Sequence, residues 1–258
     1  MNHEELTVGF KKLNLPHMGR SYVELAKIAE KDKHTYEQYL SMLVATELRE
    51  RQATRVKRYI FEAKIPLPKT FENFNFSLIS GITEKQFKRL ILGDFLKEAA
   101  NLVFYGEFGV GKSHLAMALT QKLCLEGFRC YFTSVHNLIA DLLKAKQDLT
   151  LTSLFKKLDR YDLITCDELG YTAHDQAGAD LFFQLISQRA ERKSFIITTN
   201  LTYSEWDKVF ISPLSTTAAV DRIIHNCETF NIRGPSGRKL AAEKRQVALT
   251  QQPKEGII

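Results

Sequence analysis

The stretch Gly106-Glu107-Phe108-Gly109-Val110-Gly111-Lys112-Ser113 decides how the rest of this 258-residue chain is interpreted. It matches G-x-x-x-x-G-K-[ST], the pattern of a phosphate-binding loop, at every fixed position. The apolar run over 101–105 predicts a buried strand before it, and leucines at every fourth position over 113–126 predict a helix after it. Such a loop lets successive backbone N–H groups point at one anion, and the helix N-terminus adds partial positive charge. A chance glycine-rich turn would not require the lysine, the hydroxyl and both flanking elements. We therefore predict that the chain binds a nucleoside triphosphate.

Individual roles follow from the chemistry of the loop. Lys112 is expected to reach the β- and γ-phosphates, and the Ser113 hydroxyl is expected to ligate Mg²⁺. The predicted nucleotide-binding residues are Gly106, Glu107, Phe108, Gly109, Val110, Gly111, Lys112, Ser113 and His114.

Two adjacent carboxylates are the second indication of a nucleotide-binding site. The strand predicted over 162–166 ends in Asp167 and Glu168, and ligands of parallel α/β sheets bind at the carboxyl ends of the strands. Asp167 is predicted to hold the hydration shell of Mg²⁺ opposite Ser113. Glu168 is predicted to orient and deprotonate the attacking water, as a general base. The alternative is that the two acidic residues only begin a loop.

Two more polar residues are candidates for the same chemistry. Asn200 closes the strand predicted over 194–200, where its amide could lie between Glu168, water and the γ-phosphate, although asparagine also begins turns. Arg222 lies on a later predicted helix and is not obviously within reach of its own phosphates. This indicates an arginine finger offered to a neighbouring subunit; a surface ion pair with Asp221 or Glu228 is the alternative.

Helical and alternating patterns divide the chain into three parts. Apolar spacing predicts helices over 4–13, 21–30 and 35–63, so residues 1–65 are predicted to form a small all-helical domain. The prolines of Ile65-Pro66-Leu67-Pro68-Lys69 break this pattern and mark a domain boundary. Residues 66–240 then alternate strand and helix, which favours a doubly wound parallel sheet of about five strands. Residues 241–258 are predicted to be a polar tail.

Two segments of the second domain are open to more than one interpretation. Thr70–Phe76 holds three aromatic residues at spacings of three and two. These could pack beside a nucleotide base or could seal the edge of the core. Residues 83–99 are predicted to form one helix that leads into the strand before the phosphate loop.

Net charge is concentrated at the two ends of the chain. It is +3 over residues 1–64, −1 over 65–221 and +4 over 222–258. Basic ends favour a polyanionic partner, although solubility alone would also explain them. Seven basic residues could contact DNA phosphates or could simply face solvent: Arg51, Arg55, Arg58, Lys144, Lys146, Lys156 and Lys157.

Composition excludes several classes of protein. No apolar run approaches the roughly 20 residues that span a bilayer, and the first residues contain no signal-peptide h-region. The four cysteines show no C-x-x-C spacing, which argues against a metal site or a disulfide framework. We therefore expect a cytoplasmic protein without a membrane partner.

Taken together, these motifs resemble the IstB/DnaC family of AAA+ ATPases. The resemblance covers nearly the whole chain and is closest to the IstB-like helpers of insertion-sequence transposases. It rests on four segments of the sequence: Gly106–Ser113, Leu163–Glu168, Ile196–Trp206 and Val220–Arg238. Under this resemblance they correspond to Walker A, Walker B with Asp167 and Glu168, sensor 1 at Asn200 and an arginine finger at Arg222.

The resemblance implies a Mg²⁺-dependent ATPase with an AAA+ module. Such a protein assembles as an oligomer on duplex DNA, largely without sequence preference, and recruits or activates its transposase. ATP hydrolysis would reset the assembly. A DnaC-like loader of a replicative helicase is the first alternative, and a small-molecule kinase is the second. Gly234–Arg238 departs from the family pattern, because such proteins tend to have an aromatic residue before the arginine. The chain also has no room for a full C-terminal lid, so a second-sensor role for Arg238 is left open.

Overall fold

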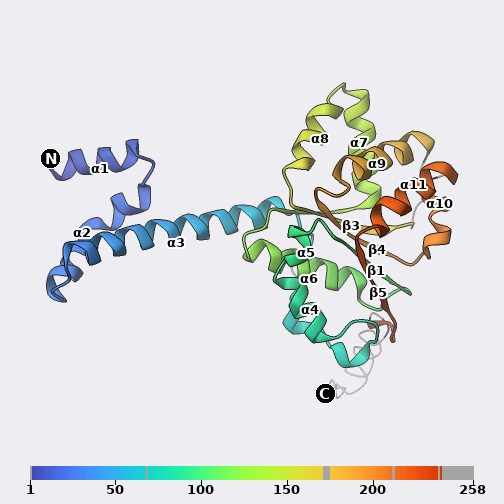
Figure 1. The fold of residues 1–258 in the computed structure, drawn as a ribbon, viewed down its shortest axis with the longest axis horizontal. Helices are drawn as coiled ribbons and strands as arrows, with labels where there is room; N and C mark the ends of the chain where they lie inside the picture. Colours follow the sequence, from blue (N-terminus) through green and yellow to red (C-terminus); the bar gives the residue numbers. More distant parts are fainter. Residues whose placement is uncertain (1, 68, 171–174, 211–212, 238, 240–258) are drawn as a thin grey trace, which may run out of the picture. The chain divides into compact units, whose positions relative to one another are not determined.

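The computed structural model describes residues 2–67, 69–170, 175–210, 213–237 and 239. Figure 1 shows the order of the helices and strands along the chain. The described residues fall into two compact units that divide between Arg58 and Tyr59.

The first unit is helical, as predicted. It contains α1 (His3–Lys12), α2 (Pro16–Lys31) and most of α3 (Tyr36–Glu62). Asn2 and Glu5 form a capping box at the start of α1, in which each side chain bonds the backbone N–H of the other. We predicted that the second helix begins at Ser21, but it begins at Pro16. The first helical position needs no N–H donor and suits the fixed φ of proline, so Pro16 starts this helix instead of breaking the chain.

A buried carboxylate joins two helices of this unit. Glu47 of α3 is 3% exposed, and its Oε2 accepts hydrogen bonds of 2.8 Å from the backbone N–H groups of His17 and Met18. These donors belong to the first turn of α2, where Leu15 provides no side-chain cap. Arg51 donates a 2.7 Å hydrogen bond to Oε1. Burial raises the pKa of Glu47, but the hydrogen bonds from Arg51, Met18 and His17 outweigh it and hold the pKa below its usual value.

Glu47→Ala should destabilise α2 by about 2 kcal/mol, because it uncaps two amides and leaves Arg51 without its partner. The pKa of Glu47 is lowered in the folded state, so its contribution is complete above the unfolded pKa of about 4.3 and is lost as the pH falls through the folded value. Hydrogen exchange of α2 peptides in the full chain should therefore be faster in the variant at pH 7, and the difference should vanish in acid. The control is Glu50→Ala, which removes a half-exposed carboxylate from the same helix. Equal exchange in the two variants at pH 7 would contradict the capping role.

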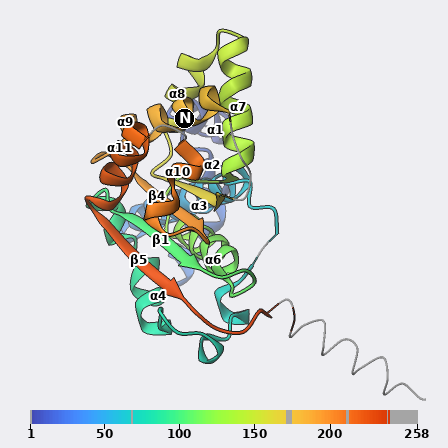
Figure 2. The ribbon, with the colours of Figure 1, turned by 90° about the vertical axis from the view of Figure 1, so that its right-hand side faces the viewer.

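The second unit is built on a five-stranded sheet. Its strands are β1 (Asn101–Gly106), β2 (Cys130–Ser134), β3 (Leu163–Leu169), β4 (Ser194–Thr199) and β5 (Cys227–Ile232). They are parallel and run in the order β2-β3-β4-β1-β5, and Figure 2 shows β5, β1 and β4 side by side. Nearly all side chains of β1 to β4 are buried, as expected for a sheet covered on both faces. The predicted doubly wound parallel sheet is confirmed.

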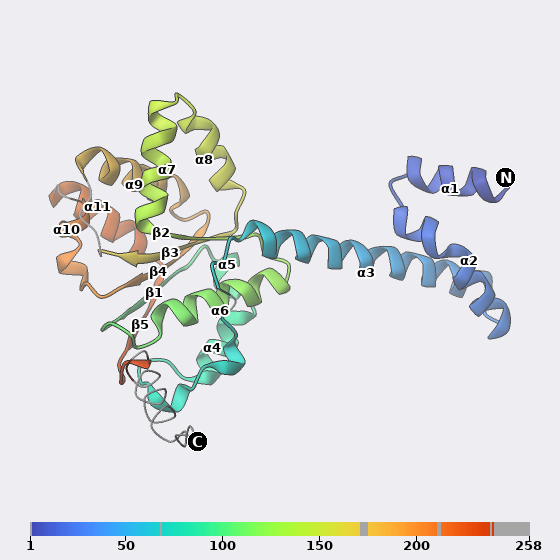
Figure 3. The same cartoon turned by 180° about the vertical axis from the view of Figure 1, so that it is seen from behind.

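Helices cover both faces of this sheet (Figures 1 and 3). One face carries α4 (Glu84–Ile91), α5 (Asp94–Lys97) and α6 (Lys112–Leu125), together with the short helices η1 (Phe71–Asn73) and η2 (Phe76–Leu78). The other face carries α7 (Val135–Gln147), α8 (Leu151–Asp159), α9 (Gln176–Arg189), η3 (Tyr203–Glu205), α10 (Asp207–Phe210) and α11 (Pro213–Ile224). Each face has its own buried apolar cluster.

One helix prediction in this unit was wrong. We predicted one helix over residues 83–99, but Gly93 has a φ of +74° and separates α4 from α5. Pro213 is the first residue of α11. Its position repeats that of Pro16, because proline is compatible with the first turn of a helix.

The buried side chain of Asn101 connects β1 to α11. Its Nδ2 donates a 3.0 Å hydrogen bond to the carbonyl of Ile223 in α11, and its Oδ1 accepts one of 2.9 Å from the N–H of Phe195 in β4. The N–H of Asn101 itself donates to the carbonyl of Asn226, just after α11. The amino end of β1 is thus hydrogen-bonded to the last turn of α11.

Candidate nucleotide-binding site

The predicted phosphate loop joins β1 directly to α6. Gly109 and Gly111 have φ values of +82° and +104°, in the left-handed region that favours glycine. A Cβ at Gly111 would lie 2.6 Å from the ring of Phe74, so the close approach of this ring also requires glycine. The strand, the loop and the helix therefore occur as the sequence predicted.

Lys112 holds the loop in its curled shape. Its side chain is 5% exposed, and its Nζ donates hydrogen bonds of 2.8 Å to the carbonyls of Gly106 and Glu107. The ammonium group is therefore bonded within the loop itself. Ser113 follows in the first turn of α6 and is half-buried.

The acidic pair lies in a β-bulge near the end of β3. We predicted that this strand ends at Cys166, but it continues to Leu169. The pairing of β3 with β4 shifts by one residue between Cys166 and Leu169, so Asp167 and Glu168 both lie opposite Thr198. Asp167 is buried and Glu168 is exposed, with a φ of +65°. A positive φ is uncommon for a residue other than glycine and often marks a functional site.

The loop and Glu168 line one hollow of about 500 Å³. Its other walls come from the segment before α4 and from the segment after β5. The residues that line it are Lys69, Asn73, Phe74, Asn75, Leu78, Ile79, Phe108, Gly109, Val110, Gly111, Lys112, Ser113, His114, Met117, Glu168, Pro235 and Gly237.

The aromatic segment 70–76 serves both the core and this hollow. Phe71 stacks on the buried Phe87 with ring centroids 5.3 Å apart, and Phe76 also contacts Phe87. Phe74 instead lines the hollow and meets the ring of His114 edge-on at 5.0 Å. A ring nitrogen of His114 lies 2.9 Å from the carbonyl of Thr70, which places this segment against the start of α6.

The segment after β5 was not predicted to reach the loop. The N–H of Gly237 donates a 3.0 Å hydrogen bond to the carbonyl of Gly109. Ser80 and Arg233 form an antiparallel bridge that brings the segments before α4 and after β5 together. The Gly-Pro-Ser-Gly composition of residues 234–237 indicates a turn, but nothing in it identifies the phosphate loop as its partner. Arg238 lies outside the described residues.

Asn200 lies at the same edge of the sheet as the loop. It follows Thr199, which pairs with Tyr105, so it comes level with the first residue of the loop. Among the described residues its Oδ1 is buried and has no hydrogen-bond partner. An unpaired buried acceptor is unfavourable and is expected to find a partner in a functional state.

Arg222 lies on the exposed side of α11 and does not line the hollow. Its Nη1 donates to the carbonyl of Ala218, and its guanidinium carbon lies 5.3 Å from the ring centre of Phe183 in α9. Glu228, one of the two alternative partners, is ion-paired with Arg89 instead. Within the described residues Arg222 makes no ion pair.

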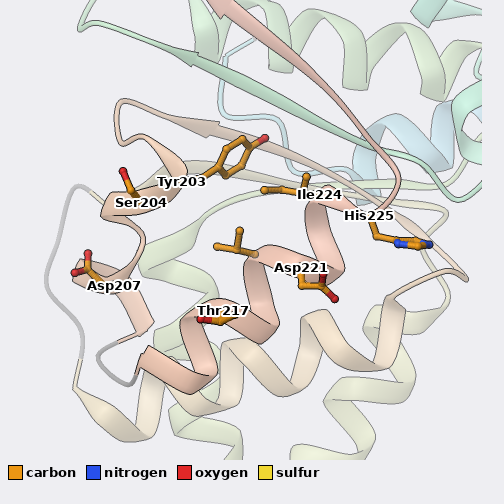
Figure 4. A pocket seen from close by; sticks show the side chains of 8 residues that line it. Tyr203, Ser204, Asp207, Thr217, Asp221, Ile224 and His225 are labelled. Atoms are coloured by element: carbon orange, nitrogen blue, oxygen red, sulfur yellow. The ribbon is translucent and has the colours of Figure 1, made fainter.

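A second hollow, of about 600 Å³, lies beside α11 (Figure 4). Tyr203, Ser204 and Asp207 line one side of it, and side chains of α11 line the other. The lining residues from α11 and its end are Thr217, Val220, Asp221, Ile224 and His225. Arg222 is not among the residues that line this hollow.

The seven basic residues form two separate groups. Arg51, Arg55 and Arg58 line a groove of about 380 Å³ in the first unit, together with His17. Arg51 is already paired with the buried Glu47.

The lysines of the second group are on α7 and α8. Lys144 and Lys157 line a groove of about 370 Å³ that also contains Asp141 and Asp148, which reduces its positive charge. Lys146 and Lys156 are exposed but do not line that groove.

The described residues contain neither a candidate metal-binding cluster nor a candidate membrane-spanning helix. No cluster of three His, Cys, Asp or Glu side chains in this part of the chain could hold a metal ion. No helix within the described ranges is long and apolar enough to cross a membrane.

The sheet order and the loop together define the class of protein. β4 separates the loop strand β1 from the acidic strand β3, and a glycine-rich loop precedes α6. This is a P-loop NTPase fold of the AAA+ class. The chain belongs to the family of IstB-like ATP binding proteins, whose profile matches residues 8–246.

Relatives and a solved structure support both statements. A Sinorhizobium fredii protein, named as an insertion sequence ATP-binding protein, is 35% identical over 94% of this chain and 82% of its own length. The IS21 ATP-binding protein of Pseudomonas aeruginosa is 33% identical over 95% of this chain and 92% of its own length. The structure of AMPPCP-bound DnaA from Aquifex aeolicus is similar with a TM-score of 0.53 and 18% identity, over 74% of this chain and 59% of that one. At that identity the similarity concerns the fold.

Proposed function

We propose that this protein is a Mg²⁺-dependent ATPase that assembles on duplex DNA and recruits or activates a transposase. The observation that carries the proposal is the shared hollow, in which the phosphate loop, Ser113 and Glu168 meet. Membership of the IstB-like ATP binding family supports ATP as the nucleotide, and the relatives named for insertion sequences support transposition as the context. Residues 66–240 would form the ATPase module, and residues 1–65 would contact DNA or a partner.

The donor groups at the loop fit a magnesium ion. Mg²⁺ prefers oxygen ligands, keeps several waters and takes few protein side chains. The Ser113 hydroxyl and the Asp167 carboxylate provide such oxygens, and Asp167 is buried next to the exposed Glu168. When bound with ATP, the ion would neutralise phosphate charge.

The remaining residues would act on phosphates and water. Lys112 would exchange a carbonyl partner for the β- and γ-phosphates, since its Nζ already lies at the centre of the loop. Glu168 would orient the attacking water and accept its proton. The unpaired Oδ1 of Asn200 would accept a hydrogen bond from that water.

Arg222 would complete the site of a neighbouring subunit. It is exposed on α11, outside its own nucleotide hollow, and has no ion-pair partner among the described residues. A guanidinium supplied in this way stabilises charge that develops on the transferred phosphoryl group. Assembly would then be a condition for fast hydrolysis, and hydrolysis would reset the assembly.

Sedimentation of the full chain with duplex DNA, with and without ATP, tests the proposal. We expect large DNA-bound assemblies only when ATP is present. Their affinity should fall by about a thousandfold between about 50 and 200 mM salt if roughly six phosphates are contacted. A protein that binds ATP but stays small and ignores DNA would contradict DNA assembly and would favour a protein ring as the client. Capture of a purified transposase or a purified hexameric helicase by the ATP-bound protein would then identify that client.

A further inference from the structure

The β-bulge that presents Asp167 and Glu168 is hydrogen-bonded to the hydroxyl group of Thr198. Thr198 is the residue of β4 that lies opposite this bulge, and it is 1% exposed. Its Oγ1 donates a hydrogen bond of 2.5 Å to Oδ1 of Asp167 and accepts one of 2.9 Å from the N–H of Glu168. One atom therefore bonds to both residues of the acidic pair, through a side chain in one case and the backbone in the other.

The neighbouring strand on the other side does not take part. Ser134 of β2 pairs with Asp167, but its hydroxyl accepts a 3.1 Å hydrogen bond from the N–H of Asn137 and caps α7. Thr133 donates its hydroxyl to the carbonyl of Ser134. Within the described residues, Thr198 is thus the side chain that orients the carboxylate of Asp167.

The bulge also needs support because its backbone is unfavourable. A backbone conformation with φ near +65°, as at Glu168, is strained for a residue other than glycine. The ladder hydrogen bond is interrupted at this point, so the N–H of Glu168 depends on the Thr198 hydroxyl for a partner. Without the hydroxyl, relief of the bulge would restore a regular register and would turn Glu168 away from the hollow.

We propose that Thr198 is a positioning residue of the ATPase site. It fixes the direction of the Asp167 carboxylate toward the ion and keeps Glu168 in the conformation that faces the attacking water. This inference rests on the proposed ATPase function. Thr198 does not line the nucleotide hollow, and it acts through the two acidic residues.

Thr198→Val and Thr198→Ser separate the hydroxyl from the shape of the side chain. Valine keeps the branched shape that suits a buried strand but removes both hydrogen bonds. We expect Thr198→Val to lower kcat by about 10- to 100-fold with little change in KM for ATP, the range seen when the supporting partner of a ligand is removed. Thr198→Ser should recover most of the activity.

A second readout is independent of turnover. The affinity for a fluorescent non-hydrolysable ATP analogue is measured in Mg²⁺ and in EDTA. Thr198→Val should match the wild type in EDTA but gain less affinity when Mg²⁺ is added, because Asp167 is no longer oriented.

The control is Thr120→Val in α6. Thr120 is also fully buried; its hydroxyl donates a 2.7 Å hydrogen bond to the carbonyl of Ala116 and lies 2.7 Å from the Thr165 hydroxyl of β3. This variant should lose stability without losing Mg²⁺-dependent affinity or kcat. Equal losses in Thr120→Val and Thr198→Val, or a Thr198→Ser protein as inactive as Thr198→Val, would overturn the proposal. A wild-type protein that does not hydrolyse ATP would instead overturn the proposed function.

Discussion

Glu168→Gln should bind ATP with unchanged affinity and lower the rate of hydrolysis by about a thousandfold. Glutamine has the same size and can still orient a water, but it cannot accept the proton, and general-base catalysis contributes about 10²- to 10⁴-fold. The side chain is exposed and lines the nucleotide hollow, so its replacement should not disturb the core. The measurements are equilibrium titration with ATP and steady-state phosphate release. Wild-type turnover in this variant would remove Glu168 from the mechanism.

Mixing with a second variant provides the control for this prediction. Arg222→Ala keeps its own Glu168 but cannot complete a neighbour's site, so each variant alone should be inactive. In a mixture, the intact site of the Arg222→Ala subunit would receive the arginine of a Glu168→Gln neighbour. Hydrolysis should then reappear in the mixture. No recovery, with mixed assemblies demonstrated by sedimentation, would show that Arg222 does not act between subunits.

Lys112→Ala should weaken ATP binding by about 100-fold and abolish ATP-dependent assembly. A charged hydrogen bond to phosphate contributes up to about 3 kcal/mol, and the variant also loses the bonds that close the loop onto Gly106 and Glu107. Titration with a fluorescent ATP analogue and sedimentation with DNA measure the two effects.

Lys122→Ala is the matched control for Lys112→Ala. It removes a lysine from the last turn of the same helix, where the side chain pairs with Glu72 at the surface. It should bind ATP normally. Unchanged assembly of Lys112→Ala in the presence of ATP would contradict a role for the loop in assembly.

Local patterns were sufficient to predict most of the fold. The strands that carry the phosphate loop, the acidic pair and Asn200 are short apolar runs, and each was predicted to within a few residues. The long α3 (Tyr36–Glu62) was predicted as 35–63, because its periodicity continues without a proline or glycine. Pro16 misled the prediction of where α2 begins, since proline breaks a helix in its interior but begins one at its first turn.

The parts of the site that the sequence did not predict depend on pairing between distant segments. The fixed residues of the loop motif lie close together in the sequence, as do the two residues of the acidic pair, and both were recognised from their spacing. Thr198 is one of two threonines at the end of an apolar strand, and its role arises only because β4 lies next to β3 with a shifted register. The contact of Gly237 with Gly109 likewise joins residues far apart in the sequence.

Asn101 has a consequence for communication between subunits. β1 carries the phosphate loop at its carboxyl end, and through Asn101 its amino end holds the last turn of α11, which bears Arg222. In the proposed assembly, the phosphates that a subunit binds and the arginine that it offers to a neighbour would therefore be attached to opposite ends of one strand. A tilt of β1 on release of phosphate would withdraw the arginine from the next subunit. The nucleotide state of each subunit would then influence the rate of hydrolysis at the site beside it.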